Sequence, residues 1–366
     1  MSSSSDAARR ARLGALIDGY VAPYLARNPT ARAAVDALAG VSDAVHWDHL
    51  AFRSFDVCGG VDALARVFLD HGYVPRDELR FEDKRLVARW YAPPDEPWAR
   101  EPDGDPSFPR VFVSNVEVDR VSPELAALAR SVAAQANPES IRRAARDGGV
   151  PWSTPVRLDT YRAMERESEY AAWTLVNGYA LNHVAVSAHR LGTTTGTGTG
   201  GTKPTTKSTT TTLERVNDLL TSPPIGLRLS AAGGNAVKAS PDGLLRQSST
   251  VADDVAMEFV DAEGRLVRAT VPASYVEFAE RLPLPTTVEE NAEENVHTAA
   301  EAEAEAEAEA EAEDADAAAA AAAAAAGVGV VARVVPERRR RDGFEVGNAD
   351  KIFESTFAAQ RRQTSG

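Results

Sequence analysis

The chain has 366 residues, 43% of them hydrophobic, and a formal net charge of −14. Thirteen acidic residues and no Lys or Arg fall within 286–327, so the rest of the chain carries a net charge of only −1. No dense basic face is evident in that remainder, so nucleic acid is not an expected partner. The single cysteine, Cys58, excludes an intrachain disulfide framework. No apolar run approaches the length of about 18 residues that a membrane span needs.

The first part of the chain predicts a helix followed by a β-α-β-β-β order of elements. Apolar residues recur at helical spacing over 8–26 and 61–70, whereas 47–55 alternates as a strand does. Three further strands are predicted, at 73–81, 86–92 and 110–118. Ser122 opens a predicted helical stretch, with Pro123 in its first turn, and this stretch continues with breaks to about residue 172.

The same order of elements then begins again. Residues 181–189 alternate like the first strand of the earlier unit, and 213–220 has helical spacing. Strands are predicted at 227–230, 244–249, 256–260 and 275–282. We therefore expect an α+β fold with two β-α-β-β-β modules and a helical insert between them.

Two low-complexity segments interrupt this pattern. Residues 193–212 are almost entirely Thr and Gly and cannot bury enough apolar area to offset their ordering entropy, which predicts a flexible insertion. Within 286–335, Glu at alternate positions places like charges at i and i+4, which predicts a frayed helix or coil. The predicted division is 1–192 (helix, first module and helical insert), 193–212, 213–285 (second module, whose first strand is 181–189), 286–335, and 336–366, which closes the site.

Three predicted strands each carry a residue of metal-ligand type on one face. Because strand residues alternate between two faces, His49 and Arg53 share one face of the first strand, and the opposite face is apolar. His183 has the same position in the second module, and Glu277 lies on the polar face of the last strand. Two histidines and one carboxylate can occupy one side of a divalent iron and leave positions for a bidentate substrate and dioxygen. Arg53 can hold the distant carboxylate of a bound diacid by a bidentate pair.

Structural interpretations of the same residues stay open at this point. A single histidine in a half-buried strand is more often hydrogen-bonded structure than a metal ligand, and Glu277 can be a solvent-facing strand residue. Arg53 can belong to a structural ion pair. His189 shares the predicted face of His183 and competes with it as the second histidine.

Four runs of sequence carry a family resemblance. They are DHLAFR at 48–53, ESEYAAWTLVNGYALNH at 167–183, SPDGLLRQSST at 240–250, and the segment 342–355. They resemble the plant and algal branch of the 2-oxoadipate dioxygenase/decarboxylase family, also called the 2-hydroxyglutarate synthase family, over about residues 10–285 and 336–357. The fold that this resemblance implies is like that of the vicinal oxygen chelate group, with paired β-α-β-β-β modules forming a half-open barrel around a metal.

The resemblance also implies an activity and a set of site residues. The family's enzymes use Fe(2+) to convert 2-oxoadipate and O2 to D-2-hydroxyglutarate and CO2 in lysine breakdown. By this similarity the metal ligands are His49, His183 and Glu277, with Glu258 and Glu280 as nearby alternatives for the carboxylate; the substrate-binding residues are Arg53, Gln247 and Ser248.

The expected partners are therefore a small-molecule 2-oxo acid and O2, without nucleic acid or membrane, and with the oligomeric state open. The compartment is left between cytoplasm and plastid. Two alternatives remain: a non-catalytic binding or scaffold protein on the same fold, and a metal-dependent isomerase or lyase that uses Zn or Mn without O2.

Overall fold

The computed structural model describes residues 3–100, 106–153, 155–192, 194–195, 207–208, 211–285 and 340–362. The predicted acidic insertion lies outside the described residues, and so does most of the predicted Thr/Gly insertion. Within the described ranges, no helix has the length and apolarity that crossing a membrane requires.

One eight-stranded sheet lies at the centre of the protein. Its strands run in the order β2-β3-β4-β1-β6-β13-β10-β9. Their bounds are β1 Trp47–Phe55, β2 Val74–Phe81, β3 Leu86–Ala92, β4 Arg110–Val116, β6 Leu181–Ser187, β9 Lys238–Ala239, β10 Leu245–Ser249 and β13 Tyr275–Arg281. The two outer strands, β2 and β9, do not pair with each other, so the sheet is half-open rather than a closed barrel.

The sheet consists of two modules with the same topology. The first is β1, α3 (Gly60–Leu69), β2, β3 and β4; the second is β6, α8 (Leu213–Thr221), β9, β10 and β13. In each module the first strand pairs parallel with the last, and the two first strands, β1 and β6, pair antiparallel at the centre. This topology confirms the predicted α+β fold with two β-α-β-β-β modules.

Two strands predicted for the second module do not belong to its sheet. Residues 227–230 form no strand beyond one isolated bridge. The predicted strand 256–260 falls within β11 (Asp254–Val260), which pairs with β12 (Leu266–Pro272) as a hairpin and with the short β5 (Val156–Arg157) in a separate sheet. A hydrogen-bonded turn after β11 folds the chain back on itself, so the module takes β9 as its outer strand instead.

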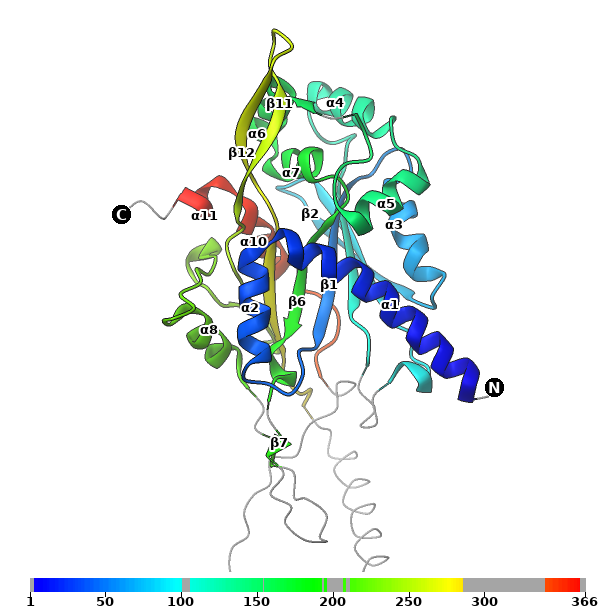
Figure 1. Cartoon of the computed structure of the whole chain (residues 1–366), viewed down its shortest axis with the longest axis vertical. Helices are drawn as coiled ribbons and strands as arrows, with labels where there is room; N and C mark the ends of the chain where they lie inside the picture. The colour runs from blue at the N-terminus through cyan, green and yellow to red at the C-terminus, as the bar shows by residue number, and fades with distance from the viewer. Residues whose placement is uncertain are drawn as a thin grey trace, which may run out of the picture.

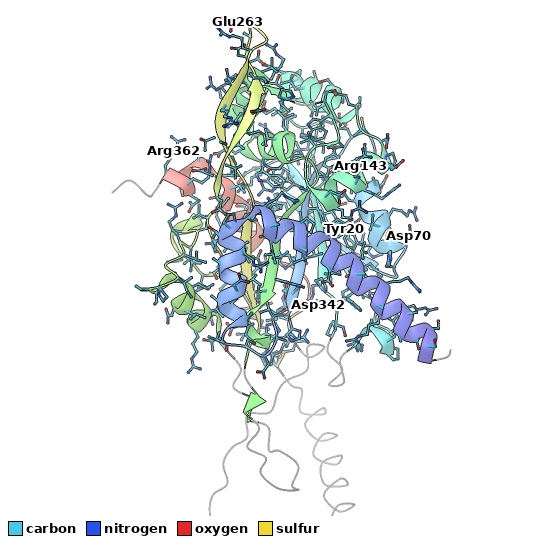
Figure 2. The ribbon with its side chains drawn as sticks, in the orientation of Figure 1. Tyr20, Asp70, Arg143, Glu263, Asp342 and Arg362 are labelled. Atoms are coloured by element: carbon cyan, nitrogen blue, oxygen red, sulfur yellow. The ribbon has the colours of Figure 1, made fainter. Side chains whose placement is uncertain are left out.

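Helices cover one face of the sheet. Figure 1 shows α1 (Ser3–Arg27) crossing in front of β1 and β6, and α2 (Pro29–Ala39) running beside β6, where it contacts β13. Tyr20 of α1, labelled in Figure 2, packs its ring on Phe52 of β1 at 5.3 Å and on Phe68 of α3 at 5.7 Å between centroids. The predicted apolar face of β1 therefore packs against helices and leaves the opposite face for polar side chains.

The helical stretch predicted after Pro123 is four separate helices. They are α4 Pro123–Ala133, α5 Pro138–Asp147, α6 Leu158–Glu167 and α7 Glu169–Asn177. Side chains cap three of them: Ser122 accepts the Leu125 N–H at the start of α4, Asn137 forms a capping box on α5, and Ser168 caps α7. These caps explain the breaks in the predicted stretch. α7 packs against β1.

The last described segment covers the other face of the sheet. It begins with a bridge between Pro283 and Arg340 and continues into α10 (Val346–Phe353), a 3-10 turn (Glu354–Thr356) and α11 (Ala358–Arg362). α10 contacts β2, β9 and β10, which belong to both modules. The C-terminal segment therefore closes the open side of the half-barrel.

Candidate metal centre

Three side chains of metal-ligand type converge from neighbouring strands. His49 lies on β1, His183 on β6 and Glu277 on β13, and each is at most 3% exposed. The Nε2 atoms of the two histidines are 3.3 Å apart. Oε2 of Glu277 lies 3.4 Å from Nε2 of His49 and 3.2 Å from Nε2 of His183. Across the part of the chain that the structure describes, no other group of three His, Cys, Asp or Glu residues brings its ligand atoms together in this way.

This triangle of donor atoms fits a metal ion held on one side. Ligand atoms bonded to one ion at about 2.1 Å and at right angles lie about 3.0 Å apart. At a bond length of about 2.1 Å, the observed separations of 3.2–3.4 Å correspond to bond angles of about 100–108°. Two imidazoles and one carboxylate are typical of facial sites for Fe(II) and similar divalent ions.

A β-bulge lies beside each of the two histidines. In the pairing of β1 with β6, Asp48 is the extra residue before His49, and Asn182 is the extra residue before His183. The bulges let each polar side chain reach the ring that follows it: Asp48 Oδ1 lies 2.8 Å from His49 Nδ1, and Asn182 Oδ1 lies 2.9 Å from His183 Nδ1. An acceptor at Nδ1 favours the tautomer whose Nε2 is free to bind a metal.

The third ligand candidate is oriented from β10. Gln247 Nε2 donates to Glu277 Oε1 at 2.6 Å, and Gln247 Oε1 accepts from Asn348 Nδ2 of α10 at 2.9 Å. This leaves Oε2 of Glu277 facing the histidines. Ser248, the neighbour that was expected to bind substrate with Gln247, points to the opposite face and donates to Asn217 of α8 at 2.7 Å. The structure therefore brings Gln247, and not Ser248, to the candidate site.

The protonation of the three residues follows from burial and mutual charge. Burial opposes the imidazolium, but Glu277 and Asp48 outweigh it and raise the pKa of His49 to about 9. Burial dominates at His183 and lowers its pKa to about 4. Burial also disfavours the Glu277 carboxylate, but the charge on His49 outweighs it and holds the pKa of Glu277 at about 2. At neutral pH, a metal ion held by the three residues would therefore have to displace a proton from His49.

Arg53 lies on the same face as the candidate ligands and is 1% exposed. Its guanidinium lies 4.6 Å from the ring centroid of Tyr170 and 5.0 Å from that of Trp173 on α7. Nη1 donates to the Thr356 hydroxyl and Nη2 to the Phe353 carbonyl, both at 3.1 Å. Each Nη group therefore serves the C-terminal segment with one of its two N–H bonds, and the bidentate grip of Arg53 on a substrate carboxylate stays a prediction.

The competing ligand candidates lie away from the triangle. His189 is in a 3-10 turn after β6, where its Nδ1 accepts a backbone N–H of β13. Glu258 is exposed on the hairpin and pairs with Arg268 at 3.3 Å. Glu280 pairs with Arg246 at 2.9 Å, opposite it in the strand register, on the other face from Glu277.

The comparison with known protein families agrees with this geometry. A family model described as 2-oxoadipate dioxygenase/decarboxylase matches residues 24–356. The chain belongs to the 2-oxoadipate dioxygenase/decarboxylase family. The matched range contains every candidate site residue of the triangle and the C-terminal segment through α10.

Plant members of the 2-oxoadipate dioxygenase/decarboxylase family are similar along nearly the whole chain. The chloroplastic enzyme of Arabidopsis thaliana is 37% identical over 370 residues, covering 100% of this chain and 82% of that protein. The chloroplastic/amyloplastic enzyme of Oryza sativa subsp. japonica is 37% identical over 347 residues, covering 93% and 78%. The crystal structure of hydroxyglutarate synthase from Oryza sativa in complex with 2-oxoadipate matches with a TM-score of 0.69 at 34% identity, covering 99% of this chain and 96% of that one.

In this member of the 2-oxoadipate dioxygenase/decarboxylase family, a buried ion pair links His49 to the C-terminal segment. Arg281 Nε and Nη2 donate to the two carboxylate oxygens of Asp48 at 2.6 and 2.9 Å, and its Nη1 donates to the Gly343 carbonyl at 2.8 Å. Arg110 reaches the same carboxylate at 3.5 Å and pairs with Asp342 at 2.6 Å. The sequence did not predict Arg281 as the partner of Asp48. The sequence does show a polar residue directly before each histidine, Asp48 and Asn182, which indicates a side chain able to hydrogen-bond the ring.

Proposed function

We propose that the chain is an Fe(II)-dependent dioxygenase that converts 2-oxoadipate and O2 to D-2-hydroxyglutarate and CO2, a step in lysine breakdown. The reaction balances without a further reductant, because the substrate supplies the electrons through loss of CO2 and hydroxylation of a neighbouring carbon. The observation that carries the proposal is the buried triangle of His49, His183 and Glu277, in a chain 37% identical to plant proteins named for this activity.

Each protein group has a defined task in this proposal. Iron, when bound by the triangle, supplies a Lewis-acid centre for the 2-oxo acid and for O2. Asp48 and Asn182 fix the orientation of the two imidazoles, and Gln247 does the same for Glu277. Arg53 supplies the positive charge for the far carboxylate of the diacid, in a site from which water is largely excluded.

Removal of the metal tests the proposal directly. We expect chelation to abolish O2 consumption with 2-oxoadipate and Fe(II) to restore it, whereas Zn(II) fills the triangle without restoring turnover. The readout is an oxygen electrode, with CO2 and the chirality of the 2-hydroxyglutarate measured in the same samples. Turnover under argon with Zn or Mn supports the isomerase or lyase alternative instead, and no turnover under any condition supports a scaffold.

We further propose a plastid location, because both plant relatives are named as chloroplastic or chloroplastic/amyloplastic. A fluorescent protein fused to the C-terminus of the full chain is expected to coincide with the plastid signal in the native cell. Diffuse cytoplasmic fluorescence contradicts this location without affecting the chemistry.

A further inference from the structure

One aromatic side chain beside the candidate ligands has no task in the function proposed above. Tyr275 lies on β13, two residues before Glu277 and on the same face, and it is fully buried. Its ring stacks on the ring of His183, with centroids 4.6 Å apart and an interplanar angle of 24°. The hydroxyl of Tyr24 donates to its backbone carbonyl, so backbone and ring are both held in place.

The hydroxyl of Tyr275 has no hydrogen-bond partner of good geometry, and the charged group that acts on it most strongly is the Arg53 guanidinium. A buried hydroxyl without a partner loses its hydration and gains nothing in return, so such groups in folded proteins call for a ligand or another explanation. A tyrosine hydroxyl is a hydrogen-bond donor at neutral pH, so Tyr275 can donate to an acceptor placed beside it.

The second donor is the buried guanidinium of Arg53, which interacts electrostatically with the Tyr275 hydroxyl. Both Nη groups of Arg53 donate to the C-terminal segment, but its Nε has no hydrogen-bond partner. The ring of Tyr170 lies against the same guanidinium, and its hydroxyl is hydrogen-bonded to Ser114 at 2.7 Å. One cationic and one neutral donor without an acceptor are the complement of a carboxylate.

We propose that Tyr275 is a specificity-determining residue whose hydroxyl, together with Nε of Arg53, donates to the far carboxylate of the 2-oxo diacid. This inference rests on the function proposed above. The ring of Tyr275 stacks on a metal-ligand candidate while its hydroxyl serves the other end of the substrate. Tyr275 therefore sets the distance between the two ends and selects diacids over monoacids of the same chain length.

The test is the variant Tyr275→Phe, which removes only the hydroxyl. Its matched control is Tyr179→Phe, because the Tyr179 hydroxyl is also buried without a partner but its ring packs on Trp152, outside the site. We expect Tyr275→Phe to bind 2-oxoadipate about 10- to 100-fold more weakly, the range of one hydrogen bond to a charged group, and to lose the same factor in kcat/KM. Turnover of 2-oxohexanoate, which lacks the far carboxylate, is expected to stay unchanged.

Three measurements separate this role from a structural one. Iron content should match wild type and the melting temperature should stay the same or rise, because the hydroxyl has no partner to lose, whereas removal of a structural hydroxyl lowers the melting temperature. Calorimetric titration with 2-oxoadipate under argon does not need turnover, so it tests Tyr275 even if the wild type consumes no O2 and the proposed function fails. Equal 2-oxoadipate affinity of wild type and Tyr275→Phe overturns the inference, and so does an equal loss in Tyr179→Phe.

Discussion

Replacing His183 with alanine should abolish both iron binding and the turnover of 2-oxoadipate. His183 provides one of three donor atoms that lie within 3.2–3.4 Å of one another. Without it, only the imidazole of His49 and the carboxylate of Glu277 remain to bind a metal ion. Loss of an outer-shell partner alone reduces metal affinity by about 10- to 100-fold, so loss of a direct ligand should exceed that range. The measurement is the iron content after loading with Fe(II) and desalting, with O2 consumption followed in the same preparation.

The control for this variant is His189→Ala. His189 is also a buried histidine near the end of the same strand, but it accepts a backbone N–H and lies outside the triangle. This variant should keep its iron and most of its activity. Full iron and activity in His183→Ala, or loss of iron in His189→Ala, means that the second histidine of the site has been assigned wrongly.

The three ligand candidates could be predicted because strand alternation is a local property. In β1, β6 and β13, a period of two leaves one face apolar and places His49, His183 and Glu277 on the other. The repeat of element order relates the two histidines to each other. The same rule separates Glu277 from Glu280, which lies on the opposite face of β13.

The pairing of strands could not be predicted, because sheet membership depends on contacts that are distant in sequence. The segment 256–260 alternates in the same way whether it joins the central sheet or a hairpin, and the pairing with β12 decides the outcome. The bulges at Asp48 and Asn182 could not be predicted from the sequence of either strand alone, because they are defined by the register between β1 and β6. The helix α2 was not predicted, because its sequence, Pro29–Ala39, is rich in alanine and has only two larger apolar side chains, Val35 and Leu38, to show a helical period.

The packing of the C-terminal segment over the site could not be predicted from local sequence patterns. Asp48 and Arg281 are 233 residues apart in sequence, yet they form a bidentate ion pair in which both side chains are fully buried. Arg281 is also the residue that holds the Gly343 carbonyl, so the ion pair connects the support of His49 to the segment that covers the site. No single strand or helix pattern contains this information.

Replacing Arg281 with methionine should therefore destabilise the protein and weaken the metal site together. Methionine retains the volume, but Asp48 loses both bidentate hydrogen bonds and keeps only His49 and the longer contact to Arg110. Leaving one partner of a buried ion pair alone costs about 3–5 kcal/mol of folding free energy. Iron affinity should fall by about 10- to 100-fold, because the carboxylate that orients His49 is itself no longer held. Denaturant unfolding and iron titration measure the two effects.

The pH dependence of this variant has a defined sign. Burial opposes the Asp48 carboxylate, but Arg281 outweighs it and holds the pKa of Asp48 well below its usual range. The stabilisation is therefore fully present above the unfolded-state pKa of about 3.9 and is lost as the pH falls through the lower folded-state value. We expect the difference in unfolding free energy between wild type and Arg281→Met to be largest near neutral pH and to shrink in acid.

An exposed ion pair provides the matched control. Arg268 pairs with Glu258 at 3.3 Å on the β11–β12 hairpin, where both side chains are mostly exposed, so Arg268→Met should cost less than about 1 kcal/mol and leave iron binding intact. The double variant Asp48→Asn, Arg281→Met removes both buried charges and should recover part of the stability that Arg281→Met loses. Equally small losses of iron affinity in Arg281→Met and Arg268→Met contradict a coupling between the buried ion pair and the metal site. A double variant no more stable than Arg281→Met shows that the lost stability comes from the contact with Gly343 and not from the unpaired Asp48 charge.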